Sequence, residues 1–236
     1  MFPVLQKTKE IALDVLFPPV CLICAAWTGD KEKPLCTECL SKIEVENTLT
    51  CPICRARMAE NVKMCHPNAP FRLAAATRYE NEIVRTLIYE LKFGKKTAAG
   101  RALADILAVY LKSLSINLST FSIIPISIHP SRRRERTFNQ AEVIAENLAE
   151  KNGLPLIKNA LMRVKATKAQ AEIKDLERRK KNLEGSFAVP HPALVQNKNI
   201  ILVDDVFTSG ATVSEAVRTL KEADAGKIIA AVAAKT

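Results

Sequence analysis

Residues 200–223 constrain the fold more strongly than any other part of this chain of 236 residues. They begin with four aliphatic residues, continue with Asp204 and Asp205, and pass through a turn of small residues into a helical pattern. A short apolar run of this kind is typical of a buried strand in a parallel sheet. Because ligands of open α/β sheets bind beyond the carboxyl ends of the strands, we expect a ligand site at the acid pair and the turn.

The acid pair and the turn have different chemical tasks. Two neighbouring carboxylates can accept hydrogen bonds from a vicinal diol such as the 2- and 3-hydroxyls of ribose. The turn offers backbone N–H groups at a helix N-terminus, where the helix dipole favours a phosphate. It consists of Thr208, Ser209, Gly210, Ala211 and Thr212. It is not a P-loop, because no lysine follows the glycine. The segment predicts a ribose phosphate site, and the alternative is a strand that ends in solvated acids before a capped helix.

Strand and helix patterns alternate along the chain from residue 71 onwards. Strands are expected at residues 72–79, 121–128, 200–203 and 227–234, and helices at residues 81–92, 98–114, 139–151 and 211–223. Such alternation predicts an α/β domain whose parallel sheet is covered on both faces. Residues 163–184 are charged and weakly apolar, which indicates a loop or a surface helix. We expect three parts: an amphipathic helix in residues 1–18, a small cysteine domain in residues 19–69 and the α/β domain in residues 70–236.

All seven cysteines of the chain lie within residues 21–65. In a protein of the cytoplasm, where we expect this chain, such a cluster favours metal binding over disulfides. Two C-x-x-C pairs can close a tetrahedron around a structural zinc ion. The predicted ligands are Cys21, Cys24, Cys36 and Cys39.

The second cysteine set is incomplete. Cys51, Cys54 and Cys65 supply three ligands, and no fourth cysteine stands near Asn68. His66 could serve instead, although its side chain directly follows that of Cys65. The sequence therefore leaves a second zinc open.

Lysine and arginine exceed aspartate and glutamate, 35 against 25, which gives a formal net charge of +10. This excess favours anionic partners such as phosphorylated small molecules, nucleic acid or acidic lipid, or it reflects a basic solvated surface. Residues 131–136 include four arginines, and residues 178–181 form a second basic cluster. The second cluster suits a solvated face, a lid over a site or a contact with a nucleic-acid backbone. No apolar run is long enough to cross a bilayer.

Residues 203–212 resemble the phosphoribosyl pyrophosphate motif of type I phosphoribosyltransferases. A wider pattern covers nearly the whole chain. It consists of the cysteine pairs, of residues 79–81, 91–93, 125–130, 132–136 and 138–142, and of Arg163, Thr167, Gln170, Arg178, Asn182 and Phe187. In this order the chain resembles the ComF family, bacterial phosphoribosyltransferase-like proteins associated with natural competence. Thr137 stands where a glycine is expected in an R-G-F-N-Q run.

This resemblance implies a Rossmann-like type I phosphoribosyltransferase domain behind a cysteine-knuckle zinc domain. It implies that Asp204 and Asp205 hold the ribose hydroxyls and that residues 208–212 surround the 5-phosphate. Pyrophosphate and magnesium are implied as well. The arginines assigned to pyrophosphate are Arg132, Arg134 and Arg136.

Two functions follow as expectations. The first is binding of phosphoribosyl pyrophosphate, with transfer of ribose-5-phosphate to an acceptor that the sequence does not name, as in glycosyltransferases of the pentosyl class. Whether turnover occurs stays open. The second is a non-catalytic competence factor that handles single-stranded DNA or partner proteins of the competence machinery and uses the site to sense a nucleotide.

Overall fold

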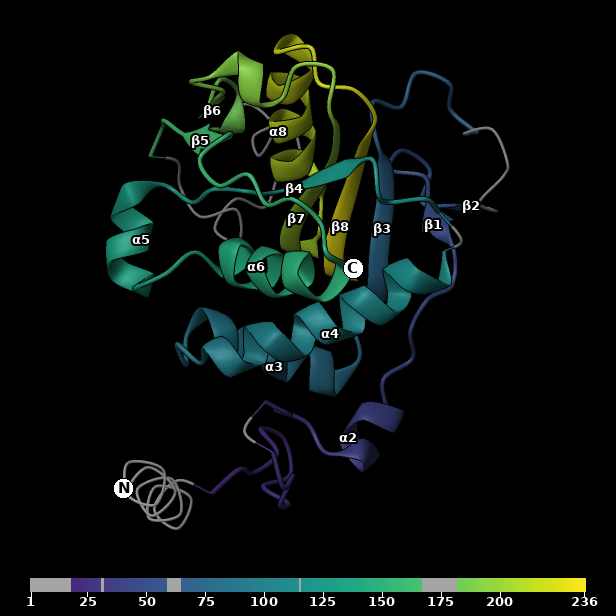
Figure 1. Cartoon of the computed structure of the whole chain (residues 1–236), viewed down its shortest axis with the longest axis vertical. Helices are drawn as coiled ribbons and strands as arrows, with labels where there is room; N and C mark the ends of the chain where they lie inside the picture. Colours follow the sequence, from purple (N-terminus) through teal and green to yellow (C-terminus); the bar gives the residue numbers. More distant parts are fainter. Residues whose placement is uncertain (1–17, 31, 59–64, 115, 167–181) are drawn as a thin grey trace, which may run out of the picture.

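The computed structural model describes residues 18–30, 32–58, 65–114, 116–166 and 182–236. Almost all of the helix expected in residues 1–18 lies outside the described residues, and so do Thr167, Gln170 and the basic cluster at 178–181. The centre of the molecule is a six-stranded sheet with the order β2-β1-β3-β8-β7-β4 (Figure 1). Its strands are β1 (Leu49–Thr50), β2 (Arg57–Met58), β3 (Arg72–Arg78), β4 (Phe121–Pro125), β7 (Asn199–Phe207) and β8 (Ile228–Lys235).

The predicted α/β fold with a parallel sheet is confirmed. Strands β3, β8, β7 and β4 pair in parallel. A separate two-stranded sheet joins β5 (Met162–Arg163) to β6 (Phe187–Ala188). The helices are α2 (Thr37–Ser41), α3 (Glu82–Lys92), α4 (Thr97–Ser113), α5 (Pro130–Arg136), α6 (Gln140–Asn152), the 3-10 turn Pro192–Leu194 and α8 (Ala211–Glu222).

Helices cover both faces of the sheet, as Figure 1 shows. Successive side chains of a strand point to opposite faces. Ile201 and Val203 of β7 join the hydrophobic core that includes α3, α4 and α6. Leu202, between them, joins the second core with α8. The apolar run of β7 is therefore buried on both sides, which explains why it lacks polar alternation.

The main differences from the expected elements lie at strand ends. Strand β4 ends at Pro125 rather than at residue 128. Strand β7 continues four residues beyond Val203, because its pairing with β8 runs on to Phe207. The arginine-rich segment forms the short helix α5, with Pro130 in its first turn and the His129 side chain accepting a hydrogen bond from Ser131 N–H. Both acids of the pair therefore lie within the last part of a strand.

The cysteine segment is joined to the α/β domain through the main sheet. Strand β1 pairs antiparallel with β3, with Thr50 opposite Leu73. Nearby, the buried carboxylate of Glu46 accepts hydrogen bonds from Arg57 at 2.8 Å and from Arg78 at 3.3 Å. This ion pair network links the cysteine segment to β3 of the main sheet. The domain boundary expected at residue 70 stays a prediction.

Candidate functional site

A cavity of about 630 Å³ lies at the carboxyl ends of the parallel strands and the N-terminus of α8. The acid pair and the whole turn of residues 208–212 line it. Arg132 and Arg136 reach the same cavity from α5, whereas Arg134 lines a neighbouring cavity instead. The structure thus brings together every residue of the proposed ribose phosphate site and two of the three arginines assigned to pyrophosphate.

The two acids are in different electrostatic environments. Asp205 is 7% exposed, and its Oδ2 lies 2.9 Å from the Nζ of Lys92 at the end of α3. Burial opposes the charge of Lys92, but the attraction of Asp205 outweighs it and raises the lysine pKa. Asp204 makes no ion pair within the described residues, and its Oδ1 accepts a hydrogen bond from the Asp205 N–H at 2.9 Å. Burial and the neighbouring Asp205 raise the pKa of Asp204 to about 7.

The turn is held by a close approach between Gly210 and Phe207. Gly210 has φ +79°, a left-handed conformation that favours glycine. A Cβ atom at this position would lie 2.5 Å from Cζ of the buried Phe207 ring. Ala211 N–H donates to the Ser209 hydroxyl at 3.4 Å, at the start of α8. The glycine is therefore required both by the backbone angle and by the space available.

Arg55 reaches the turn from the cysteine segment. Its Nη2 donates to the Thr208 carbonyl at 2.7 Å, and its guanidinium lies 4.6 Å from the centre of the Phe207 ring. The backbone N–H of Arg55 donates to the Cys51 carbonyl at 3.0 Å within the second cysteine cluster. One residue thus contacts both the second cysteine cluster and the turn of residues 208–212. This contact could not be predicted from the sequence, because the two partners are 153 positions apart.

Three more residues of the cavity had no predicted role. Lys92 and Asn139 belong to segments that carry the family resemblance, and Asn139 donates to the Ile126 carbonyl at 3.0 Å. Arg163 of β5 is only 8% exposed. Its burial, with repulsion from Arg132, lowers the arginine pKa to about 10 against the attraction of Asp204.

The loop after α5 has a left-handed backbone conformation at Thr137, the position where a glycine was expected. Thr137 has φ +77°, within the left-handed region. Arg136 Nη1 donates to the Gln140 Oε1 at 3.1 Å on the other side of the loop, and Arg133 pairs with Glu142 at 3.1 Å. These contacts hold the arginine helix against α6.

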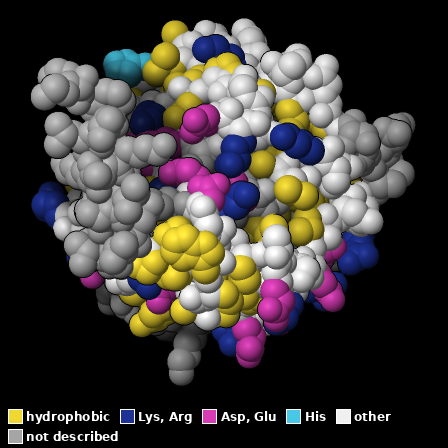
Figure 2. Space-filling view, turned by 60° about the horizontal axis from the view of Figure 1, so that its bottom comes forward, with side chains coloured by type: hydrophobic (Ala, Val, Ile, Leu, Met, Phe, Trp, Pro, Cys, Tyr) yellow, Lys and Arg dark blue, Asp and Glu magenta, His cyan; other side chains and the backbone are white. Residues whose placement is uncertain are grey.

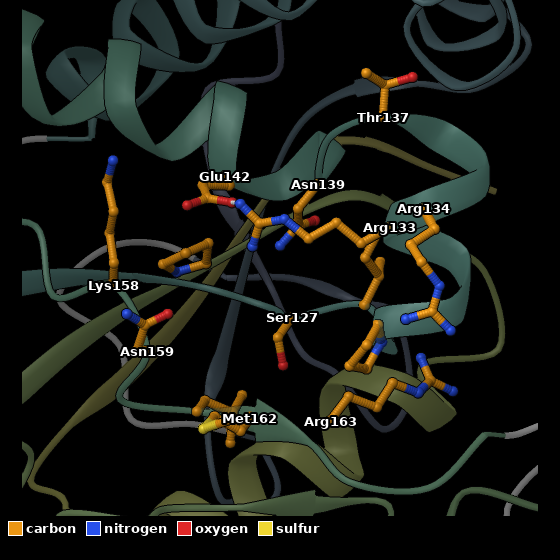
Figure 3. Close-up of a pocket in the computed structure, with 14 residues that line it drawn as sticks. Ser127, Arg133, Arg134, Thr137, Asn139, Glu142, Lys158, Asn159, Met162 and Arg163 are labelled. Carbon is orange, nitrogen blue, oxygen red and sulfur yellow. Dashed lines mark ion pairs between the residues drawn. The ribbon is translucent and has the colours of Figure 1, made fainter.

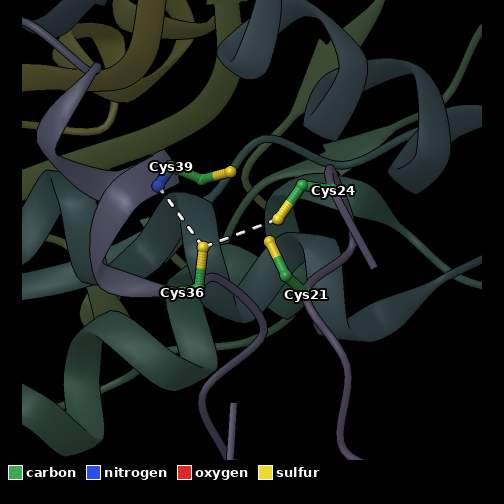
Figure 4. A group of neighbouring side chains, drawn as sticks. All are labelled: Cys21, Cys24, Cys36 and Cys39. Atoms are coloured by element: carbon green, nitrogen blue, oxygen red, sulfur yellow. Dashed lines mark hydrogen bonds between the residues drawn. The ribbon is translucent and has the colours of Figure 1, made fainter. Parts of the chain in front are cut away.

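The first cysteine cluster brings four thiols around one point (Figure 4). All four sulfur atoms lie within 4.8 Å of one another, and the Sγ atoms of Cys24 and Cys36 are 3.6 Å apart. Zinc–sulfur bonds of about 2.3 Å give a tetrahedron with edges of about 3.8 Å. The chain's seven cysteines are free thiols. The predicted set of Cys21, Cys24, Cys36 and Cys39 therefore fits a structural zinc ion.

The second cluster contains His66 as its fourth member. The ligand atoms of Cys51, Cys54, Cys65 and His66 all lie within 4.8 Å of one another. His66 Nδ1 is 3.5 Å from the Cys51 Sγ and 3.4 Å from the Cys65 Sγ. The short reach from the backbone to Nδ1 lets two consecutive residues point at the same place, so adjacency to Cys65 is no obstacle. Burial acts against the Cys51 thiolate, but hydrogen bonds from nearby backbone N–H groups outweigh it and lower the pKa to about 6.

We predict two zinc ions per chain, one for each cluster. Replacing His66 by alanine removes one of four ligands and should lower the zinc content to about one ion per chain. His66→Cys, which restores a ligand, should keep two ions, and so should His191→Ala at a histidine outside both clusters. Elemental analysis of purified protein measures the content. Two ions in His66→Ala would contradict the assignment.

Comparison with known proteins agrees with this architecture. The double zinc ribbon domain model matches residues 12–67, and the phosphoribosyl transferase domain model matches residues 147–236. The chain carries a double zinc ribbon followed by a phosphoribosyltransferase domain. Neither domain match by itself identifies a substrate or a reaction.

Several curated proteins are similar to most of the chain, and their names are of two kinds. "DNA utilization protein YhgH" from Salmonella typhimurium is 27% identical, over 79% of this chain and 90% of the relative. "Competence protein F" from Haemophilus influenzae is 29% identical, over 60% of this chain and 63% of the relative. "Competence protein ComFC" from Bacillus subtilis is 25% identical, over 86% and 89%. These relatives confirm the resemblance to the ComF family. In the part of the chain that the structure describes, no helix is long and apolar enough to cross a membrane.

Proposed function

We propose that the chain binds phosphoribosyl pyrophosphate in the cavity at the carboxyl end of β7 and transfers its ribose-5-phosphate group to an acceptor. One observation carries this proposal: the acid pair, the glycine turn and two arginines line a single cavity of about 630 Å³. Cavities of this size are usual for small-molecule ligands. The matching phosphoribosyl transferase domain supports it, since the match includes the acid pair and the turn.

Each part of the ligand has a partner in this cavity. The N–H groups of residues 208–212 would hold the 5-phosphate at the N-terminus of α8. The carboxylates of Asp204 and Asp205 would accept hydrogen bonds from the two ribose hydroxyls. Arg132 and Arg136 would bind the pyrophosphate, because guanidinium groups match phosphate oxygens with two parallel hydrogen bonds.

The reaction needs positioning and charge rather than a protein nucleophile. The acceptor forms a bond to the anomeric carbon while the bond from that carbon to pyrophosphate breaks, and pyrophosphate leaves with the electron pair. Positive charge develops on the sugar ring in the transition state. The carboxylate of Asp204 would stabilise this charge, and Arg132 and Arg136 would stabilise the departing pyrophosphate.

Magnesium fits the free carboxylate of the site. Asp204 offers hard oxygen donors and has no ion pair within the described residues, whereas Asp205 is paired with Lys92. Asp204 would hold the ion together with phosphate oxygens, and the ion would add positive charge beside the leaving group. Asp205 Oδ2 is held by Lys92, and its other carboxylate oxygen can accept a hydrogen bond from the ligand.

Calorimetric titration with phosphoribosyl pyrophosphate, with and without magnesium, tests the proposal. We expect saturable binding that is tighter with magnesium. Absence of binding to folded, zinc-loaded protein would refute it. Release of pyrophosphate in the presence of candidate bases and amines then tests the transfer step.

Ligand binding should depend on pH through Asp204. Its pKa is raised to about 7, and ionisation makes its carboxylate a stronger acceptor for the ribose hydroxyl that it is proposed to bind. Between pH 6 and pH 8 the affinity should therefore rise about tenfold beyond the change caused by ionisation of the ligand itself. Asp204→Asn should remove this extra rise, because the ligand's own ionisation is the same for both proteins. Equal pH profiles for the two proteins would show that Asp204 does not titrate in this range.

A second candidate function is a role in DNA uptake without turnover. The names of the relatives favour it, since they refer to competence and DNA utilization. On the face shown in Figure 2, however, lysine and arginine side chains lie in several separate places among acidic ones. Fluorescence anisotropy with a labelled single-stranded oligonucleotide at several salt concentrations tests this role. Substituting Arg178 and Lys181, which lie outside the described residues, should weaken such binding and lower its salt dependence.

A further inference from the structure

A second cavity, of about 560 Å³, lies next to the first (Figure 3). It is enclosed by α5, the start of α6, β5 and the end of β4. The two cavities share Ser127, Ile128, Asn139 and Arg163 as a common wall. The proposed transfer reaction takes place in the first cavity, and none of its steps involves the second cavity.

Among the described residues that line the second cavity, positive charges outnumber negative ones. The positive ones are Arg133, Arg134, Lys158 and Arg163, with one carboxylate, that of Glu142, which pairs with Arg133 at 3.1 Å. Arg134 makes no ion pair with any residue that the structure describes. Figure 3 shows the guanidinium groups of Arg134 and Arg163 on the same side of the cavity. Two cations that face one space favour an anion with several oxygen atoms between them.

The side of the cavity away from the arginines is apolar. Met162 of β5 is 46% exposed, and Leu161 and Pro125 lie beside it in the lining. A methionine side chain adapts its shape and contacts flat rings favourably. Asn159, between Lys158 and the apolar residues, adds an amide that can donate and accept hydrogen bonds. The cavity therefore combines an anion-binding side with a side suited to a ring.

We propose that the second cavity binds a phosphorylated ring compound of the nucleoside monophosphate class. The phosphate lies between Arg134 and Arg163, and the ring lies against Met162. A ligand there is separate from the sugar phosphate of the first cavity, so both can be bound at once. This inference does not depend on the proposed transfer reaction.

Adenosine 5′-monophosphate is the probe, and calorimetry on the full chain gives its affinity. Met162→Glu places a negative charge against the ring and the phosphate, and we expect at least a tenfold loss of affinity for the probe. Met162→Leu keeps an apolar wall and should bind within about twofold of the unchanged protein. Arg134→Glu should lose the probe in the same way, whereas Lys112→Glu, on the exposed side of α4, should not. Circular dichroism verifies that each variant is folded.

The outcomes separate the two cavities. Binding of the probe to protein saturated with phosphoribosyl pyrophosphate, and its loss in Met162→Glu, are expected. Probe binding that disappears in the double variant Asp204→Ala and Asp205→Ala but persists in Met162→Glu would place the probe in the first cavity and overturn the inference. The absence of saturable binding at millimolar probe would overturn it as well. If the probe binds as expected while phosphoribosyl pyrophosphate does not bind, the second site stands and the proposed function falls.

Discussion

Replacing Asp204 and Asp205 by alanine together abolishes binding of phosphoribosyl pyrophosphate. Each carboxylate is expected to accept a hydrogen bond from the ribose, and hydrogen bonds to charged groups contribute about 1.5–3 kcal/mol each. Their combined loss corresponds to a decrease in affinity of at least about 100-fold. Calorimetric titration in the presence of magnesium measures it. Affinity within threefold of the unchanged protein would show that the acids do not hold the ligand.

The same change leaves a buried cation without its partner, so folding needs a separate control. Lys92 pairs with Asp205 at 2.9 Å and makes no other ion pair within the described residues. The double alanine variant should therefore be less stable to heat, and adding Lys92→Met should recover part of the melting temperature. The triple variant should still fail to bind. Loss of binding can then be assigned to the missing carboxylates rather than to unfolding.

Substituting Gly210 by alanine should have the next largest effect. The new Cβ would lie 2.5 Å from Cζ of Phe207, and φ is +79°. We expect at least a tenfold loss of affinity for phosphoribosyl pyrophosphate, since the turn has to shift to relieve the contact. A fall in the melting temperature should accompany it.

Gly153 provides a matched control for the backbone strain alone. It also has a left-handed φ, +62°, but a Cβ there would meet nothing within 4 Å. Gly153→Ala should destabilise the fold by about 1 kcal/mol and leave ligand affinity unchanged. In Gly210→Ala, the second change Phe207→Leu should restore part of the affinity. If both glycine variants bind equally well, the contact with Phe207 is not what shapes the turn.

Which residues line the candidate site could be predicted from the sequence where they are neighbours along the chain. Asp204, Asp205 and the turn of residues 208–212 follow one another along one strand, one turn and one helix, so their proximity needs no knowledge of the fold. Lys92 and Arg163 come from other segments, and only the packing of α3 and β5 against β7 brings them to the same cavity. Neighbours along the chain can also be separated by the fold. Arg132 and Arg134 lie on the same short helix α5, but Arg132 lines the first cavity and Arg134 lines the second.

The order of strands and helices was also largely predictable, because burial on two faces leaves long apolar runs in β7 and β8. The ends of strands were harder to predict. Strand β7 continues through two acids, since backbone pairing with β8 does not depend on whether a side chain is charged. The short strands β1 and β2 had no signal of their own, because two residues are too few to show a period.

The contact of Arg55 with Thr208 has a thermodynamic consequence. Arg55 belongs to the turn between Cys51 and Cys65, and its side chain holds the carbonyl that precedes the phosphate-binding N–H groups. When two binding events share such a link, each changes the affinity of the other by the same factor. We therefore expect a metal ion in the second cysteine cluster to raise the affinity for the proposed sugar phosphate, and the bound sugar phosphate to raise the affinity for the metal by the same factor. Under this proposal, the release of the metal to a chelator would report whether the cavity is occupied.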